Sequence, residues 1–169
     1  MLIITGSMGA GKTSVLAEAS DILALRGIVH AAIDLDALSL AYLPSAAGTD
    51  GVMYRNLQSV CQNYAAQGVT RLLLARAMED RAELELCQSV VSASNTIVCR
   101  LTATVAEMQQ RVKMRESGML QQQFVDRVAI LDDILDRARL EDFVVINEGR
   151  SIDDVAQEML IKAGWISGW

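Results

Sequence analysis

The chain has 169 residues, of which 51% are hydrophobic, which suits one compact domain with its own core and excludes a disordered chain. The net charge of −6 argues against a nucleic-acid partner. No apolar run approaches the roughly 18 residues that a membrane span needs, and no basic segment resembling a secretory signal precedes the first apolar run. Three widely spaced cysteines and one histidine make a structural zinc site unexpected. We therefore expect a cytoplasmic protein, a monomer or a homodimer, with reduced thiols.

The first half of the chain alternates short apolar runs with segments of helical periodicity, a pattern typical of a parallel α/β sheet. Strands are expected at residues 2–5, 28–33 and 70–75. Helices are expected from a glycine-rich turn to about residue 26, over 37–43 before the only proline, and over 52–67, with a loop at 44–51.

The second half continues the alternation. The spacings Asp80–Glu83 and Thr104–Glu107 are those of helix capping boxes. Helices are expected over 81–92 and 105–114. A polar stretch at 115–123 precedes a long helix that ends at about residue 140, and a last helix covers 151–164. Strands are expected at 96–101 and 143–146. Five strands with helices between them predict a three-layer α/β/α sandwich, formed by residues 1–169 as a single domain.

Residues 6–13 match the pattern G-x-x-x-x-G-K-[ST] at every fixed position. Glycines let successive backbone N–H groups turn inward around an anion, and the helix that follows directs its positive end at the same point. The pattern follows an apolar strand and opens a helix, which disfavours a chance match. We expect ATP and Mg²⁺ to bind here, with the lysine at the β and γ phosphates and the threonine hydroxyl on the metal. The expected nucleotide contacts are Gly6, Ser7, Met8, Gly9, Ala10, Gly11, Lys12, Thr13 and Ser14.

Asp34 and Asp36 follow the second expected strand. In an open parallel sheet, the loops after neighbouring strands open at the same edge, so these carboxylates should face the phosphate loop. Asp34 could hold Mg²⁺ together with Thr13, and Asp36 could accept or orient the hydroxyl proton of a substrate. The alternative is a pair of solvated carboxylates, with Asp36 capping the next helix. We expect both aspartates to contact substrate and Asp36 to be catalytic.

With this loop and this acidic pair, the chain resembles the small P-loop kinases of the nucleoside-monophosphate-kinase-like group. Shikimate, gluconate and adenylylsulfate kinases and chloramphenicol phosphotransferase belong to that group. The resemblance covers nearly the whole chain and rests most on the loop motif. It implies a P-loop NTPase fold with strand order 2-3-1-4-5. It also implies an acceptor-binding region at about residues 37–68 and a lid at about residues 111–127.

A basic segment falls in the expected lid. Arg111 and Arg115 share one helix face, and Lys113 lies off that face. The resemblance implies lid arginines that close over the transferring phosphoryl group, supply positive charge and exclude water. The alternative is a solvated helix face paired with Glu107 and Glu116. We expect Arg111 and Arg115 to be catalytic, together with Lys12 and Asp36.

Three further residues are candidates for ligand contacts. Gly149 follows the fifth strand, where the resemblance implies packing against adenine; the alternative is an ordinary turn. Arg55 suits an anionic or polyol acceptor, although it could serve only surface solubility. Arg76 follows the third strand, at the edge that faces the site. That strand lacks an acidic residue at its tip, so metal binding would depend on Thr13 and Asp34.

Together these features predict a kinase that transfers the γ-phosphoryl group of ATP to a hydroxyl of a small-molecule acceptor, a metabolite or an antibiotic. The alternative is a nucleotide-binding P-loop ATPase or regulatory protein with little or no kinase activity. The residue types in the expected acceptor region do not specify one acceptor.

Overall fold

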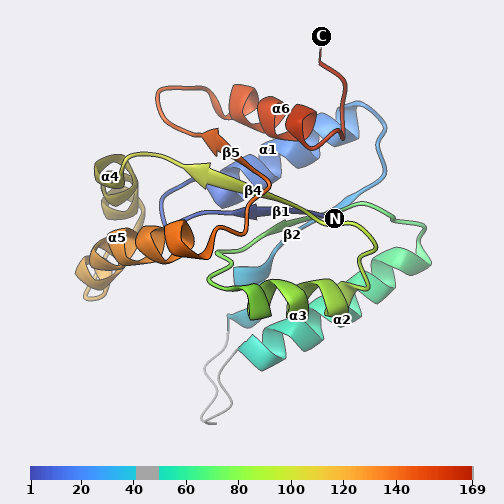
Figure 1. Cartoon of the computed structure of the whole chain (residues 1–169), viewed down its shortest axis with the longest axis horizontal. Coiled ribbons are helices and arrows are strands. Elements are labelled where there is room, and N and C mark those ends of the chain that lie inside the picture. The colour runs from blue at the N-terminus through green and yellow to red at the C-terminus, as the bar shows by residue number, and fades with distance from the viewer. Residues whose placement is uncertain (41–49, 169) are drawn as a thin grey trace.

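The computed structural model describes residues 1–40 and 50–168 (Figure 1). Its five strands form one parallel sheet in the order β2-β3-β1-β4-β5, which confirms the predicted order. The strands are β1 (Leu2–Thr5), β2 (Ala31–Asp34), β3 (Leu72–Ala75), β4 (Ile97–Thr102) and β5 (Phe143–Ile146).

Helices connect these parallel strands. They are α1 (Lys12–Leu25), the 3-10 helix η1 (Leu35–Ser39), α2 (Asp50–Ala66), α3 (Arg81–Val91), α4 (Val105–Arg115), α5 (Gln121–Ala138) and α6 (Ile152–Lys162). Figure 1 shows α1 and α6 on one face of the sheet and α2 and α3 on the other, so the three-layer sandwich is confirmed. It also shows α4 and α5 together at the end toward which β4 points. None of the helices in the described part of the chain is long and apolar enough to cross a membrane.

The core lies on both faces of the central strand β1, whose four residues are all buried. Leu2 and Ile4 belong to the cluster that includes α1 and α6, while Ile3 belongs to the cluster that includes α2 and α3. This division follows from the alternation of side chains along a strand. It explains why the strand is a continuous apolar run, since parallel sheets are covered on both faces. Cys61, Cys87 and Cys99 are buried and free.

Two strands begin two or more residues later than predicted, β2 at Ala31 and not residue 28, and β3 at Leu72 and not residue 70. Before β2, the backbone N–H of Ile28 bonds to the Leu23 carbonyl, and the His30 ring bonds to the Ile28 carbonyl and to Ser20. Residues 28–30 therefore close the end of α1, where Ile28 packs against the core and Val29 is exposed.

The short helix predicted at 37–43 is a 3-10 helix that begins two residues earlier and covers residues 35–39, and the predicted end at 41–43 lies outside the described residues. The Asp34 side chain accepts a bond from the backbone N–H of Asp36, which starts this turn as soon as β2 ends. Residues 41–49, which include most of the predicted loop, lie outside the described residues. The next helix begins at residue 50, two residues earlier than predicted.

The remaining helices lie close to their predicted positions. Asp80 and Thr104 cap α3 and α4 as predicted, by accepting bonds from the backbone N–H groups of Glu83 and Glu107. Helix α5 begins at Gln121, inside the predicted polar stretch. The Gln121 side chain donates to the backbone carbonyls of Lys113, in the last turn of α4, and of Glu116, just after it, so a polar residue secures the start of α5.

Candidate functional site

The phosphate loop lies between β1 and α1, and its shape depends on glycines that neighbouring elements crowd. Gly9 and Gly11 have φ angles of +79° and +95°. A Cβ at Gly9 would lie 2.3 Å from the Met108 carbonyl oxygen, and one at Gly11 would lie 2.2 Å from Nδ2 of Asn147. No other residue fits either position without displacing α4 or the loop after β5.

The other residues of the phosphate loop either bond to neighbouring elements or line a small cavity beside the loop. The buried Ser7 hydroxyl donates to the Val128 carbonyl at 2.8 Å, and the buried Asn147 amide donates to the Ala10 carbonyl at 2.8 Å. Ser7 and Ala10 therefore anchor the loop. A cavity of about 120 Å³ lies beside it, lined by Met8, Gly9, Gly11, Lys12, Thr13, Ser14, Asp36 and Arg115.

The Lys12 side chain folds back over the start of the phosphate loop. Its Nζ donates to the carbonyl oxygens of Gly6 at 3.0 Å and Ser7 at 3.2 Å. Burial lowers the pKa of Lys12, and the nearby carboxylates of Asp36 and Asp34 oppose that shift. A poorly solvated ammonium at the start of a helix suits the binding of a multiply charged anion.

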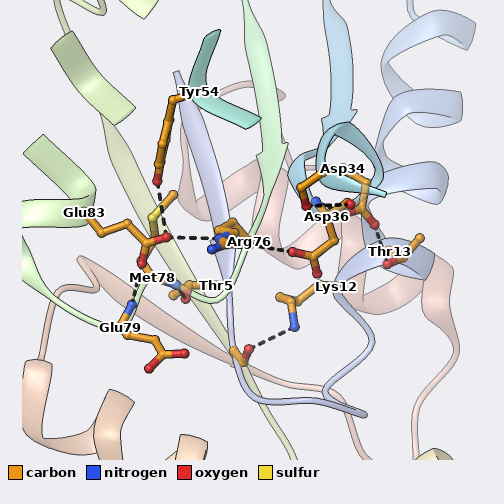
Figure 2. Close-up of polar contacts among 12 residues, drawn as sticks. Thr5, Lys12, Thr13, Asp34, Asp36, Tyr54, Arg76, Met78, Glu79 and Glu83 are labelled. Carbon is orange, nitrogen blue, oxygen red and sulfur yellow. Dashed lines mark hydrogen bonds and ion pairs between the residues drawn. The ribbon is translucent and has the colours of Figure 1, made fainter. Parts of the chain in front are cut away.

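Thr13 and Asp34 form the pair that could hold Mg²⁺. The Thr13 hydroxyl donates to Oδ2 of Asp34 at 2.7 Å, and Oδ1 of Asp34 accepts from the Asp36 backbone N–H at 3.1 Å (Figure 2). No group of three or more histidine, cysteine or acidic residues in the described part of the chain could hold a metal ion. Two protein oxygens fit Mg²⁺ nevertheless, because this ion keeps several waters and binds substrate phosphates.

A chain of polar contacts leads away from the phosphate loop (Figure 2). Asp36 Oδ1 accepts from Nη1 of Arg76 at 2.9 Å, and Nε of Arg76 donates to Oε1 of Glu83 at 3.0 Å. The Tyr54 hydroxyl donates to the same Glu83 oxygen at 3.2 Å, and the Glu79 backbone N–H donates to Oε2. Burial acts to lower the pKa of Arg76, but bonds to Glu83 and Asp36 raise it overall. Arg76 therefore stays charged between two carboxylates.

A larger cavity of about 700 Å³ begins at this chain of contacts and lies between α2 and α3. Arg55 and Arg76 both line it, so the structure brings together the two arginines predicted to contact the acceptor. Asp36 lines the phosphate cavity and its partner Arg76 lines the larger one, so this ion pair lies between the two spaces.

The two arginines of the predicted lid lie in different environments. Arg111 donates to the carbonyl oxygens of Gly9 at 3.3 Å and Asn147 at 2.9 Å, and its Nε pairs with Glu107. Arg111 thus ties the phosphate loop to the loop after β5. Arg115 lines the phosphate cavity and pairs with Glu116. Both ion pairs named in the alternative interpretation are therefore present.

Gly149 has a φ of +66°, and a Cβ there would meet no atom within 4 Å. Its conformation favours glycine in the turn between β5 and α6, whether or not a base approaches it. The neighbouring Glu148 carboxylate accepts bonds from the backbone N–H and hydroxyl of Thr104. Contact between Gly149 and a nucleotide stays a prediction.

Glu83 and Asn147 organise the site in ways that were not predicted from the sequence. Glu83 was interpreted as part of a capping box, yet its carboxylate binds Arg76 and Tyr54. The seven-residue separation of Glu83 from Arg76 spans a strand end, a turn and a helix start, so no periodic pattern marks it. Asn147 gave a clearer signal, since it directly follows an apolar strand and its amide can bond to a backbone carbonyl of the glycine-rich loop.

No protein-family model matches the sequence, and no curated protein matches it. Solved structures match it in fold. A gluconokinase from Sinorhizobium meliloti is 14% identical, covers 97% of this chain and 91% of its own, and has a TM-score of 0.63. An APS kinase from Mycobacterium tuberculosis, in complex with AMPPNP and APS, is 19% identical, covers 96% of each chain and also has a TM-score of 0.63.

A shikimate kinase from Acinetobacter baumannii, in complex with shikimate, is 18% identical, covers 97% of this chain and 92% of its own, and has a TM-score of 0.59. Identities this low show the fold alone. The chain therefore has the fold of the small P-loop kinases, as the resemblance in its sequence implied.

Proposed function

We propose that this protein is an ATP-dependent kinase that transfers the γ-phosphoryl group to a hydroxyl of a small-molecule acceptor. The observation that carries the proposal is the ion pair between Asp36 and Arg76, with 2.9 Å between Oδ1 and Nη1. It lies between the phosphate cavity and the cavity between α2 and α3, with one partner in the lining of each. A hydroxyl that reaches this pair from the larger cavity would face the γ phosphate. The fold shared with gluconokinase, APS kinase and shikimate kinase supports the same class of reaction.

In this proposal the phosphate loop holds ATP. Backbone N–H groups of residues 9–13 and the ammonium of Lys12 bind the phosphates, and the hydroxyl of Thr13 and the carboxylate of Asp34 hold the metal. Mg²⁺ bound there supplies charge neutralisation at the β and γ phosphate oxygens. Arg111 keeps the loop in place through the Gly9 carbonyl, so its contacts favour a positioning role.

The transfer step balances with ATP and the acceptor alone. The acceptor oxygen forms a bond to the γ phosphorus, and the bond from that phosphorus to the bridging oxygen breaks, so ADP leaves with the electron pair. The hydroxyl proton passes to the Asp36 carboxylate, whose orientation is fixed by Arg76. Lys12 and Arg115, which both line the phosphate cavity, offset the charge on the transferring group.

The test is ADP formation across a panel of hydroxyl-bearing metabolites and antibiotics, with wild type and Asp36→Asn compared. We expect an acceptor to stimulate ADP formation, and Asp36→Asn to lower the stimulated rate roughly 100-fold because the proton acceptor is lost. ATP affinity, measured by calorimetry, should change little. The matched control is Asp21→Asn, which alters an exposed carboxylate on α1.

Slow ATP hydrolysis that no acceptor stimulates, and that Asp36→Asn leaves unchanged, would contradict the kinase proposal. That result would favour the alternative, a nucleotide-binding ATPase or regulatory protein with little or no kinase activity. One observation favours this alternative: Oδ1 of Asp36 is already engaged by Arg76 at 2.9 Å.

A further inference from the structure

The cavity between α2 and α3 has a wall of apolar side chains. Ala82, Leu86 and Val90 line it at successive positions four residues apart, which places them on one face of α3. Leu86 is 47% exposed, so the described residues leave this wall partly open to a ligand. A volume of about 700 Å³ is ample for a molecule of drug size and larger than a six-carbon sugar acid needs.

The charges around the same cavity do not favour an anionic ligand. Two guanidinium groups and three carboxylates line it among the described residues, namely Arg55, Arg76, Glu79, Asp80 and Glu83. The Glu79 carboxylate is paired with Arg127 of α5, so cations and carboxylates are nearly balanced around the cavity. The better-buried cation, Arg76, is held between Asp36 and Glu83. An anion placed against it would compete with two carboxylates already in contact, and would meet the repulsion of both.

Arg55 does not make the cavity attractive to an anion. It lies on α2, is exposed, and its guanidinium has no hydrogen-bond or ion-pair partner within residues 1–40 and 50–168. Because water and salt screen an exposed charge, Arg55 adds little attraction for an anion. It remains well placed to donate hydrogen bonds to an uncharged oxygen at the outer end of the cavity.

The polar end and the apolar wall lie at different places along the cavity. Tyr54, Arg76 and Glu83 form the end that meets Asp36, as Figure 2 shows, whereas Leu86 and Val90 lie one and two turns further along α3. A ligand that fills both parts must carry hydroxyl or amide groups at one end and an apolar body beyond them.

We propose that the acceptor of this protein is an uncharged, amphipathic alcohol, with its reactive hydroxyl at Asp36 and its apolar body against Leu86 and Val90. This inference rests on the proposed kinase function. An acceptor of this kind differs from the small hydroxy acids that other kinases phosphorylate. The proposal also makes Leu86 a determinant of acceptor specificity.

The experiment compares alcohols that differ in charge and apolar area. The first class contains alkyl and aryl β-glucosides and N-acyl amino alcohols; the second is glucose; the third is gluconate, which has the same terminal primary hydroxyl as glucose. Binding is measured by saturation-transfer NMR and transfer by ADP formation, for wild type, Leu86→Ser and the control Leu25→Ser. Leu25 is 89% exposed and lies on α1, on the other face of the sheet.

We expect binding and phosphorylation to be strongest in the first class. Leu86→Ser should lower kcat/KM for that class about tenfold and leave glucose unaffected, because only the apolar contact is lost. Leu25→Ser should match wild type. A preference for gluconate or glucose, or no binding by any member of the first class, would overturn the inference. If compounds of the first class bind, and Leu86→Ser weakens that binding, but none is phosphorylated, the result would support the ligand class and contradict the proposed kinase function.

Discussion

The phosphate loop and the cavity between α2 and α3 are built in different ways. The loop presents mainly backbone groups, and residues from distant parts of the chain hold it in one shape: Arg111 and Asn147 bond to its carbonyls, and Val128 accepts from Ser7. The cavity presents side chains from two helices and the end of β3. A backbone site tolerates little change, whereas a side-chain site can be altered one residue at a time. Phosphate binding should therefore be fragile to substitution, and acceptor choice should be adjustable.

The strongest test of this contrast uses two glycines with similar backbone angles. Gly9→Ala would place a Cβ against the Met108 carbonyl, whereas Gly68→Ala would meet no atom within 4 Å. We expect Gly9→Ala to weaken ATP binding by about 100-fold or more, because the displaced loop misaligns its N–H groups. Gly68→Ala should lose only about 1 kcal/mol of stability to backbone strain and keep its ATP affinity. Calorimetry and thermal unfolding measure both effects, and equal ATP affinities in the two variants would break the comparison.

The cations beside the phosphate loop should differ in function: one should contribute mainly to ATP binding and the other mainly to phosphoryl transfer. Lys12→Ala should weaken ATP binding roughly 100-fold, since its buried ammonium is lost from the phosphates. Arg115→Ala should lower acceptor-stimulated turnover about tenfold with a smaller change in ATP affinity, because the exposed Arg115 acts on charge that develops during transfer. The exposed Lys113→Ala is the control for removing a positive charge from α4. Full turnover in the Arg115 variant would refute its proposed role.

The smallest effect is expected where the two regions meet. Glu83→Gln keeps the shape of the side chain but removes one of the charges that hold Arg76, so Arg76 should orient Asp36 less well. We expect acceptor-stimulated kcat to fall about fivefold to tenfold, with ATP affinity unchanged. Glu85→Gln, at an exposed position on the same helix, is the control.

A double-mutant cycle separates positioning from a purely structural role of Glu83. If Glu83 acts through Arg76 and Asp36, then Glu83→Gln should have little further effect on turnover in the Asp36→Asn background. Additive losses in that cycle would show that Glu83 affects turnover by another route.

The parts of the site that could be predicted are those that short stretches of sequence encode. Glycines, a lysine and a threonine at fixed spacing after an apolar run define the phosphate loop. Asp34 and Asp36 were placed correctly beside it, because the carboxyl ends of parallel strands share one edge of the sheet. The predicted start of β2 was wrong because tertiary contacts intervene: residues 28–30 have the composition of a strand, but they close the end of α1.

The sequence by itself determined the fold class, the strand order through its resemblance to known kinases, and the phosphate loop, because each depends on local periodicity or on one contiguous motif. The tertiary structure alone decided which charged side chains pair with one another and which line the cavities. It separated Arg111 from Arg115, although they lie one turn apart on the same helix. It also placed Arg76 between Asp36 and Glu83, forty residues before it and seven after it in the chain. Such pairings depend on where the chain folds back on itself, and no local pattern encodes that.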